Sequence, residues 1–247
     1  MRFYAPFLMR FLDKADMILA TSPQYLASSA MLRRFSDKCR IVPLGIPAEE
    51  YAVPDEALVT ALRERYGSPY VFFCGVHRYY KGLPWLVRAA AKIRARVVIA
   101  GDGPERESVM ALAGELGVDI AFPGRLSHAE LVAHLYGCAV TAFPSCERSE
   151  AFGLSVLEAH ACGRPVVATR LGTGVEYVNE DGKTGLNVPP KNAEALAAAI
   201  NELLENEPAR NVMGAYARER VKTTFNAETL ARTEFELYEQ VLAARRS

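Results

Sequence analysis

The sequence predicts an α/β protein built on a doubly wound parallel sheet, and three observations lead to this prediction. From about residue 68 to residue 223, short runs rich in β-branched and aromatic residues alternate with longer stretches of helical period. Strands that are separated by helices pair in parallel through right-handed crossovers. Half of the 247 residues are hydrophobic, so the chain can bury a large core.

The expected strands are short and bounded by turn-forming or charged residues, as strands of α/β proteins are. The first two come before a proline-rich stretch and the others follow it. They cover residues 17–21, 40–44, 70–76, 96–100, 120–123, 139–143, 165–169 and 186–188.

The expected helices lie between and after these strands, and several have clear start signals. Ser127 and Glu130 have the spacing of a capping box, Asn192 is a good N-cap, and Pro208 suits a first helical turn. The helices cover residues 23–34, 55–66, 83–95, 105–116, 128–136, 155–162, 193–204, 208–223 and 227–244.

The first fifty residues do not form a domain by themselves, because two strands and one helix cannot close one. Pro43, Pro47 and Pro54 then break the chain as a linker does. Two interpretations remain. This segment is either an extra layer on the main domain or the tail of a domain whose earlier part is absent.

Composition excludes several classes of protein. The 29 basic and 29 acidic residues give a formal net charge of zero, so there is no basic excess for nucleic acid, and we expect no nucleic-acid partner. Five scattered cysteines without a C-x-x-C pair fit a reducing cytoplasm better than a disulfide framework. Arg10 and Asp13 interrupt the N-terminal apolar run, and no segment is typical of a signal peptide or membrane span.

The loop after the strand at 70–76 is a candidate phosphate site. Gly75 permits a tight exit from the strand, and Arg78 and Lys81 precede Gly82 at the start of a helix. Two cations beside a helix N-terminus suit a phosphate through charge and through hydrogen bonds. His77 lies in the same loop. The alternative is that both cations are ordinary solvated loop charges.

The stretch from Glu150 to Glu158 is the most informative one. Gly153 lies where a helix begins, so the backbone amides of residues 153–155 can approach a ligand oxygen closely. Glu158 lies in the first turns of that helix, and a carboxylate there can accept two hydrogen bonds from a vicinal diol. The alternative is that Glu150 is a loop charge and Glu158 a residue that merely favours the helix dipole.

Other motif-like segments carry little weight. Residues 101–106 start like a dinucleotide-binding fingerprint, but Arg106 occupies the third glycine position, which weakens a dehydrogenase interpretation. Residues 182–184 end like a P-loop but precede a strand. No H-E-x-x-H or D-x-D spacing occurs, so we expect no tightly bound metal and no cofactor.

Together these segments resemble the nucleotide-sugar-binding half of the retaining GT-B glycosyltransferases of group 1. The most specific part is Glu150 to Gly163: two glutamates with seven residues between them, Phe-Gly-Leu inside, then Glu158-Ala-His-Ala-Cys-Gly. The supporting matches are less specific. They are Gly75 with Lys81-Gly82, Ala-Gly-Asp-Gly-Pro at 100–104, Pro-Gly-Arg-Leu-Ser at 123–127, Phe-Pro-Ser at 143–145 and Asp-Gly-Lys-Thr-Gly at 181–185.

The resemblance implies a Rossmann-like GT-B C-terminal domain and a role for each matching residue. Lys81 would hold the donor diphosphate, Glu150 would face the transferred sugar, and Glu158 would hold the ribose diol. The loop at 125–127 would border the base. The implied catalytic residues are Glu150, Lys81 and Arg78, and the implied donor-binding residues are Gly75, His77, Arg125, Leu126, Phe152, Gly153, Leu154 and Glu158.

Two departures from the family pattern agree with one subgroup. Val76 stands where an arginine commonly clamps the diphosphate, and Arg78 is close enough to replace it. Arg-Tyr-Tyr-Lys-Gly at 78–82 resembles a subgroup that transfers mannose and related sugars in bacterial surface polysaccharides, including lipopolysaccharide. Thr-Gly-Val at 173–175, in place of the commoner Gly-Ile-Pro, agrees with the same subgroup.

The resemblance also implies a domain division. Residues 1–50 would be the remnant of an N-terminal, acceptor-side domain with its linker, residues 51–224 the nucleotide-sugar-binding domain, and residues 225–247 a helix that crosses back. The partners would be a nucleoside-diphosphate sugar, a lipid-linked or saccharide acceptor, and the missing N-terminal domain. The apolar stripe of Phe3, Phe7, Leu8, Phe11 and Leu12, with Arg2 and Arg10 nearby, is either a helix for that domain or a peripheral membrane contact.

The implied activity is metal-independent transfer of a hexose to an acceptor hydroxyl, with the anomeric configuration retained. The first alternative is a catalytically silent donor-binding module, since most of one cleft wall is absent. The second is a GT-B epimerase or phosphorylase. Donor binding measured beside transfer activity separates the first alternative from the enzyme.

Overall fold

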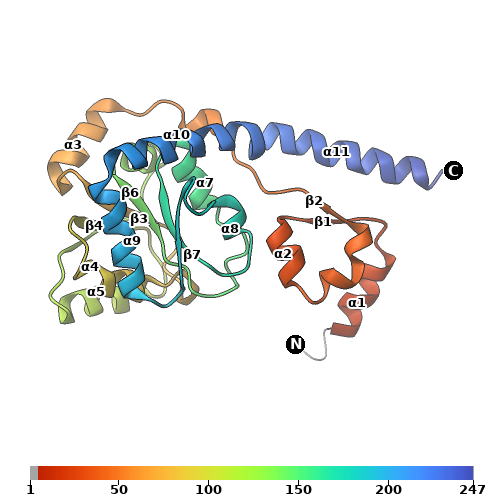
Figure 1. Ribbon diagram of the computed structural model, residues 1–247, viewed down its shortest axis with the longest axis horizontal. Helices are drawn as coiled ribbons and strands as arrows, with labels where there is room; N and C mark the ends of the chain where they lie inside the picture. The colour runs from red at the N-terminus through yellow and green to blue at the C-terminus, as the bar shows by residue number, and fades with distance from the viewer. Residues whose placement is uncertain (1–4, 247) are drawn as a thin grey trace.

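The computed structural model describes residues 5–246, and its main feature is a six-stranded sheet with every neighbouring pair parallel. The spatial order of the strands is β5-β4-β3-β6-β7-β8. The predicted doubly wound parallel sheet is therefore confirmed (Figure 1). The strands are β3 (Tyr70–Cys74), β4 (Arg96–Ala100), β5 (Ile120–Gly124), β6 (Val140–Phe143), β7 (Val166–Thr169) and β8 (Gly185–Val188).

Helices cover both faces of this sheet, and successive residues of a strand alternate between them. In β3, Phe72 packs into one core and its neighbours Val71 and Phe73 into the other. The first core lies under α3 (Glu56–Tyr66), α6 (His128–Gly137), α7 (Leu154–Ala161) and α10 (Glu207–Thr224), and the second under α4 (Leu83–Ala90), α5 (Arg106–Glu115) and α9 (Ala193–Glu205).

The direction of winding reverses between β3 and β6. The chain proceeds from β3 through β4 to β5 on one side, and from β6 through β7 to β8 on the other. In open α/β sheets, ligands bind outside the carboxyl ends of the strands at such a switch point. The loops that leave β3 and β6 are therefore the ones to inspect.

A smaller unit precedes this domain and has its own parallel pair of strands and its own core. It contains α1 (Ala5–Lys14), β1 (Ile18–Ala20), α2 (Pro23–Ser28), the 3₁₀ helix η1 (Leu32–Lys38) and β2 (Cys39–Ile41). Leu12, Ile18, Phe35 and Cys39 form the centre of its core. Figure 1 shows this unit apart from the larger sheet and beneath the last helix.

The expectation of one helix over residues 23–34 is wrong. Helix α2 ends at Ser28, and Ser29 has extended backbone angles. The hydroxyl of Ser29 accepts from the amide of Leu32 at 3.3 Å, a local bond that competes with continuation of the helix, and the Ser28 hydroxyl donates to the carbonyl of Gly172 on the other unit at 2.6 Å. Three further short helices were not predicted: η2 (Ala48–Tyr51), η3 (Tyr79–Lys81) and α8 (Val175–Val178).

Two chain connections run between the units, and they are hydrogen-bonded to each other. The amide of Ile46 donates to the carbonyl of Phe225 at 3.0 Å, and the amide of Ala227 donates to the carbonyl of Ile46 at 3.1 Å. A side chain on Gly45 would start 2.6 Å from the Phe225 carbonyl oxygen, so only glycine allows this close approach. The two connections therefore behave as one joint.

Helix α11 (Ala227–Ala244) extends from this joint over the small unit (Figure 1). Arg245, just after the helix, forms an ion pair with Asp16 at 2.5 Å. Helix α11 and β1 line a shared apolar cavity of about 320 Å³. Phe235 and Tyr238 of the same helix are 62% and 59% exposed, so much of its apolar surface is uncovered.

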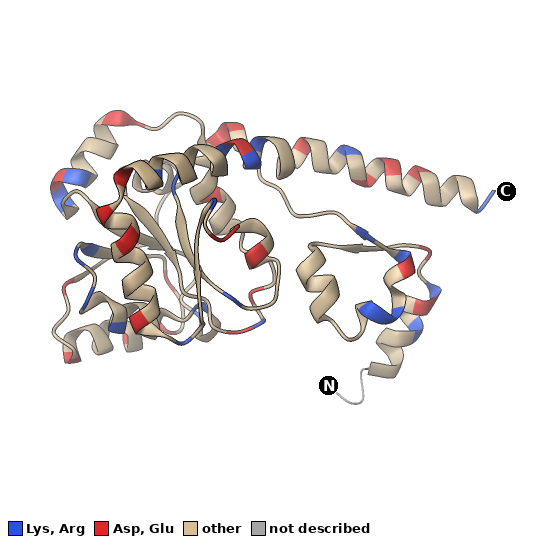
Figure 2. Ribbon diagram, viewed as in Figure 1, with Lys and Arg blue, Asp and Glu red and all other residues tan. Residues whose placement is uncertain are grey.

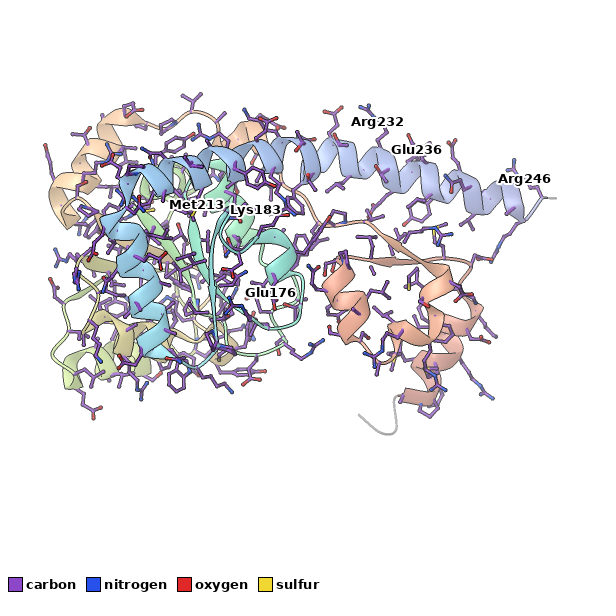
Figure 3. All side chains as sticks on the ribbon, viewed as in Figure 1. Glu176, Lys183, Met213, Arg232, Glu236 and Arg246 are labelled. Atoms are coloured by element: carbon purple, nitrogen blue, oxygen red, sulfur yellow. The ribbon has the colours of Figure 1, made fainter. Side chains whose placement is uncertain are left out.

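Charged residues of both signs are interspersed over both units (Figure 2). On α11, Arg232 pairs with Glu228 at 3.2 Å on the side that faces away from the small unit (Figure 3). In α1, Phe7 and Phe11 are each 70% exposed, while Arg2 and Phe3 of the proposed stripe lie outside the described residues. Between residues 5 and 246, the structure has no helix that is both long and apolar enough to cross a membrane.

Candidate functional site

A pocket of about 530 Å³ lies at the switch point, outside the carboxyl ends of β3 and β6. It is bounded by the end of β3 and the loop after it, the loop after β6 and the first turns of α7. Leu131 of α6 and Leu44 of the connecting segment (residues 42–55, between β2 and α3) complete its lining. Its lining residues are Leu44, Cys74, Gly75, Lys81, Leu131, Ser149, Glu150, Ala151, Phe152, Gly153, Leu154, Ser155 and Glu158.

The loop after β3 brings Lys81 into this pocket because the next residue is a glycine. Gly82 has a φ of +67°, and a Cβ on it would lie 2.0 Å from the carbonyl oxygen of Pro144. The two loops are also joined by a 2.7 Å hydrogen bond from the amide of Cys146 to the carbonyl of Tyr80. The loop after β3 is therefore held directly against the loop after β6.

Lys81 and Glu150 meet in the pocket. The Lys81 ammonium lies 2.6 Å from Oε2 of Glu150, and the two side chains are only 14% and 11% exposed. The hydroxyl of the fully buried Ser145 donates to the same carboxylate oxygen at 3.0 Å. The ammonium also lies over the rings of Phe143 and Tyr80, at 5.2 and 5.5 Å from their centroids.

Helix α7 opens on Gly153, as the sequence predicts. Gly153 has a φ of +95°, a left-handed conformation that favours glycine, and the helix begins at the next residue. Phe152 is buried against Phe225, while Leu154 is 46% exposed. Gly153, Leu154 and Ser155, which precede the first backbone bond of α7 from Val156 to Gly153, thus present their amides at the pocket wall, where an anion or a hydroxyl oxygen can accept from them.

Glu158 follows one turn further along α7 and is held from behind. The hydroxyl of Tyr51 donates to Oε1 of Glu158 at 3.1 Å. Burial raises the pKa of Glu158, and the hydrogen bond from Tyr51 acts in the opposite direction. Burial also raises the pKa of the neighbouring Cys74 thiol to about 12, so this thiol is neutral at physiological pH.

Seven of the predicted site residues line one pocket, and four do not. The seven are Gly75, Lys81, Glu150, Phe152, Gly153, Leu154 and Glu158, and the four are His77, Arg78, Arg125 and Leu126. His77 is fully buried, with Nε2 3.2 Å from the carbonyl oxygen of Ala100, and burial lowers its pKa. Arg125 is exposed and pairs with Asp102 at 3.3 Å, at the ends of β5 and β4.

Two residues that the sequence analysis did not assign contact the site carboxylates. Ser145 lies at the end of the Phe-Pro-Ser segment, which the family resemblance already included, so a signal for it was present. Tyr51 lies in a 3₁₀ helix of the connecting segment, more than a hundred residues before Glu158 in the sequence. No motif marks it.

The chemistry of the pocket is that of hydrogen bonds and one cation. Among residues 5–246, no group of three or more His, Cys, Asp or Glu side chains is placed to hold a metal ion. Glu150 and Glu158 lie in the same pocket, but one is paired with Lys81 and the other accepts from Tyr51.

A cation, a helix N-terminus and a buried carboxylate lie around one switch-point pocket of an α/β protein, and this arrangement suits a polar, anionic ligand. The chain belongs to the family described as Glycosyl transferases group 1, whose model matches residues 56–220.

Relatives at moderate identity agree with this family. The chain is 36% identical over 247 residues to O-antigen chain mannosyltransferase C of Escherichia coli, and this alignment covers 99% of this chain and 66% of the relative. It is 37% identical over 228 residues to the D-rhamnosyltransferase WbpZ of Pseudomonas aeruginosa, covering 92% of this chain and 60% of the relative. The chain thus spans less than two thirds of the length of these relatives.

Solved structures share the fold. The sucrose-phosphate synthase of Thermosynechococcus elongatus is 30% identical with a TM-score of 0.85, over 99% of this chain and 63% of that one. The Anabaena protein Alr3699/HepE, solved with UDP and glucose, has a TM-score of 0.83 over 97% of this chain and 68% of that one, at 19% identity. The second likeness concerns the fold alone.

Proposed function

We propose that this chain forms the donor side of a glycosyltransferase that moves a hexose from a nucleoside-diphosphate sugar to an acceptor hydroxyl. The observation that carries the proposal is the meeting of Lys81, Glu150 and Glu158 with the glycine-opened start of α7 in one pocket. Family membership supports the same reaction class. In this proposal the anomeric configuration is retained and no metal takes part.

The leaving group sets the main electrostatic requirement. Departure of a diphosphate builds negative charge on the leaving oxygen, and without a metal this charge needs protein cations and N–H donors. Lys81 and the first-turn amides of α7 supply them in this proposal. Arg78 is the second cation, and since its side chain is exposed outside the pocket lining, it would have to turn toward a bound donor.

Glu150 and Glu158 have different roles in this proposal because their surroundings differ. Glu150 is ion-paired to the lysine that would hold the diphosphate, so it lies beside the reacting centre and can stabilise positive charge on the sugar. Glu158 lies further along α7, and in this proposal its carboxylate accepts hydrogen bonds from the two ribose hydroxyls. His77, Arg125 and Leu126 stay proposed neighbours of the donor, the last two at the base.

The sugar in this proposal is mannose or a related hexose. The support is the 36% identity to an O-antigen mannosyltransferase and the 37% identity to a rhamnosyltransferase, both over more than nine tenths of this chain. The acceptor would be a saccharide or lipid-linked saccharide of a bacterial surface polysaccharide. We accordingly propose a cytoplasmic protein, with at most peripheral contact at the inner face of the membrane through the exposed phenylalanines of α1.

The domain division remains part of the proposal. Residues 1–50 would belong to the acceptor-side domain, residues 51–224 would bind the donor, and residues 225–247 would cross back over the first part. The exposed apolar surfaces of α1 and α11 would then contact the rest of that acceptor-side domain.

A second candidate function is a donor-binding module without turnover, because Leu44 alone of residues 5–50 lines the pocket. The two candidates differ in one measurement. Donor binding is measured by calorimetry, and transfer to a saccharide acceptor is measured with and without an added N-terminal domain from a relative. Transfer in either mixture supports the enzyme, and binding without transfer in both supports the module.

The first test is a thermal-shift panel of UDP, GDP, ADP and their sugars on the purified chain, followed by calorimetry with the best ligand. We expect Glu158→Ala to weaken binding about tenfold, the cost of losing a charge-assisted hydrogen bond pair. The matched control is Glu202→Ala, an exposed glutamate on α9. A panel in which no nucleotide raises the melting temperature would contradict the proposed donor site.

A further inference from the structure

Tyr51 connects the joint between the two units to the buried carboxylate of the pocket. It is the last residue of η2 and lies five residues after Ile46. Ile46 donates its amide to the carbonyl of Phe225 and accepts from the amide of Ala227. Its hydroxyl donates to Oε1 of Glu158 at 3.1 Å. The donor lies on the connecting segment and the acceptor on α7, so this bond links two parts of the chain that are far apart in sequence.

The ring of Tyr51 is fixed from several directions. The side chain is only 6% exposed, and its ring meets the ring of His128 edge to face with centroids 5.1 Å apart. The Tyr51 carbonyl accepts a hydrogen bond from the hydroxyl of Tyr136 at 3.0 Å. The hydroxyl of Tyr51 therefore has one accessible position, and that position is against Glu158.

The arrangement leaves Glu158 with one oxygen held and the other available. Glu158 lines the pocket, whereas Tyr51 does not and lies behind the carboxylate. A carboxylate oxygen that accepts from a fixed hydroxyl cannot rotate freely. Because Glu158 lines the pocket, a ligand hydroxyl there can reach this carboxylate while Tyr51 holds Oε1 from behind.

We propose that Tyr51 is a positioning residue, which holds Glu158 in the orientation and charge state that a ligand diol requires. This inference rests on the proposed function, because it assigns the diol to Glu158. Tyr51 itself does not touch the ligand. Through Tyr51, a displacement of the joint between the units changes the geometry at Glu158.

The charge state matters because only the ionised carboxylate accepts from both hydroxyls of a diol. Burial favours the neutral acid, and the Tyr51 hydrogen bond favours the ionised form, so loss of the hydroxyl raises the pKa of Glu158 further. The other titratable groups that face Glu158 come from β3, η3, α6 and the end of α7. They are Cys74, Lys81, His128 and Cys162.

The first experiment reads Glu158 directly in the whole, ligand-free chain. The carboxyl carbon signals of ¹³C-labelled glutamate are followed against pH, and the signal that Glu158→Gln removes is assigned to Glu158. We expect Tyr51→Phe to raise the pKa of Glu158, because the hydrogen bond that favours the ionised carboxylate is lost. Tyr66→Phe is the matched control, since Tyr66 is equally buried, at 6%, in the same core. An unchanged titration in Tyr51→Phe overturns the proposal.

The second experiment measures the affinity for the nucleotide that the panel selects, at pH 8 and pH 6. We expect Tyr51→Phe to weaken binding about tenfold at pH 6 and less at pH 8. A loss that is equal at both pH values is what a merely structural role gives, and it overturns the proposal. If the wild-type chain binds no nucleotide, the proposed function fails, and the titration alone decides whether Tyr51 sets the state of Glu158.

Discussion

Lys81 and Glu150 form an ion pair of 2.6 Å across the boundary between the two halves of the sheet. Lys81 comes from the loop after β3 and Glu150 from the loop after β6, the two strands at which the winding reverses. Both groups are largely withdrawn from water, so each depends on the other for charge compensation. In the proposed function, a donor diphosphate at Lys81 would therefore compete with Glu150 or share the ammonium with it.

Removal of the Lys81 charge is expected to weaken nucleoside-diphosphate binding. Lys81→Met keeps most of the side-chain volume and removes the ammonium, and a hydrogen bond to a charged group contributes about 1.5–3 kcal/mol. The expected dissociation constant, measured by calorimetry, is thus about 10- to 100-fold higher. Lys92→Met is the control, because Lys92 pairs with Glu194 in an exposed ion pair outside the pocket. Equal effects of both variants would contradict a specific phosphate contact.

Neutralisation of Glu150 is expected to act in the opposite direction on diphosphate binding. Glu150→Gln retains an acceptor for Ser145 but no longer neutralises Lys81. The freed ammonium then binds a diphosphate more tightly, by about fivefold, which corresponds to about 1 kcal/mol. The same variant is expected to slow sugar transfer, since Glu150 faces the reacting centre in the proposed mechanism. Weaker diphosphate binding in this variant would refute the competition between carboxylate and phosphate.

The alternation of strands and helices was sufficient to predict the sheet, because burial on both faces leaves parallel pairing as the main solution. The Glu150–Glu158 segment was equally readable, since a glycine at the start of a helix and two carboxylates lie within nine residues of sequence. The break after Ser28 was not predictable. The Ser28 hydroxyl there donates to the carbonyl of Gly172, 144 residues further along the chain, and the local pattern contains no information about such a contact.

In the site too, local sequence patterns were readable, whereas contacts between residues far apart in the chain were not. The ion pair of Lys81 with Glu150 joins residues 69 positions apart, and local spacing contains no information about such a contact. The burial of His77 is another example, because its ring lies 3.2 Å from the carbonyl of Ala100 at the end of β4 and Gly103 of the following loop packs closely on its backbone. Tyr51 was not predicted because its contact with Glu158 joins residues 107 positions apart. Its proposed role follows from the path of the connecting segment and not from any motif.

A side chain at Gly82 is expected to destabilise the fold and displace Lys81. In Gly82→Ala the new Cβ meets the Pro144 carbonyl oxygen at 2.0 Å, and the φ of +67° is strained for any residue with a Cβ. We expect urea unfolding to show a loss of about 2 kcal/mol or more. The control is Gly114→Ala in α5, where a Cβ meets nothing within 4 Å. It is expected to gain about 0.5 kcal/mol from helix propensity, and a loss there as large as at Gly82 would contradict the steric argument.

Stability is expected to fall as the pH is lowered from about 6.5, because burial lowers the pKa of three histidines, His77, His134 and His160. Burial lowers the pKa of His134 to about 4 and that of His160 to about 3. His134 stacks on Phe72 with ring centroids 4.6 Å apart, and Nε2 of His160 lies 3.2 Å from the side-chain oxygen of Asn179. In the unfolded chain both histidines titrate near 6.5, so between pH 6.5 and pH 4 the unfolded state binds more protons than the folded one.

Each of these histidines therefore reduces the free energy of unfolding by up to about 1.4 kcal/mol per pH unit in this range. Urea unfolding at pH 7, 6 and 5 measures the slope. His134→Gln is less stable at pH 7, since it loses the stacked ring, but its stability depends less steeply on pH because one titrating group is gone. If His134→Gln and the wild-type chain lose stability in parallel, His134 is not held neutral by burial, and the packing of its ring against Phe72 has no electrostatic consequence for the fold.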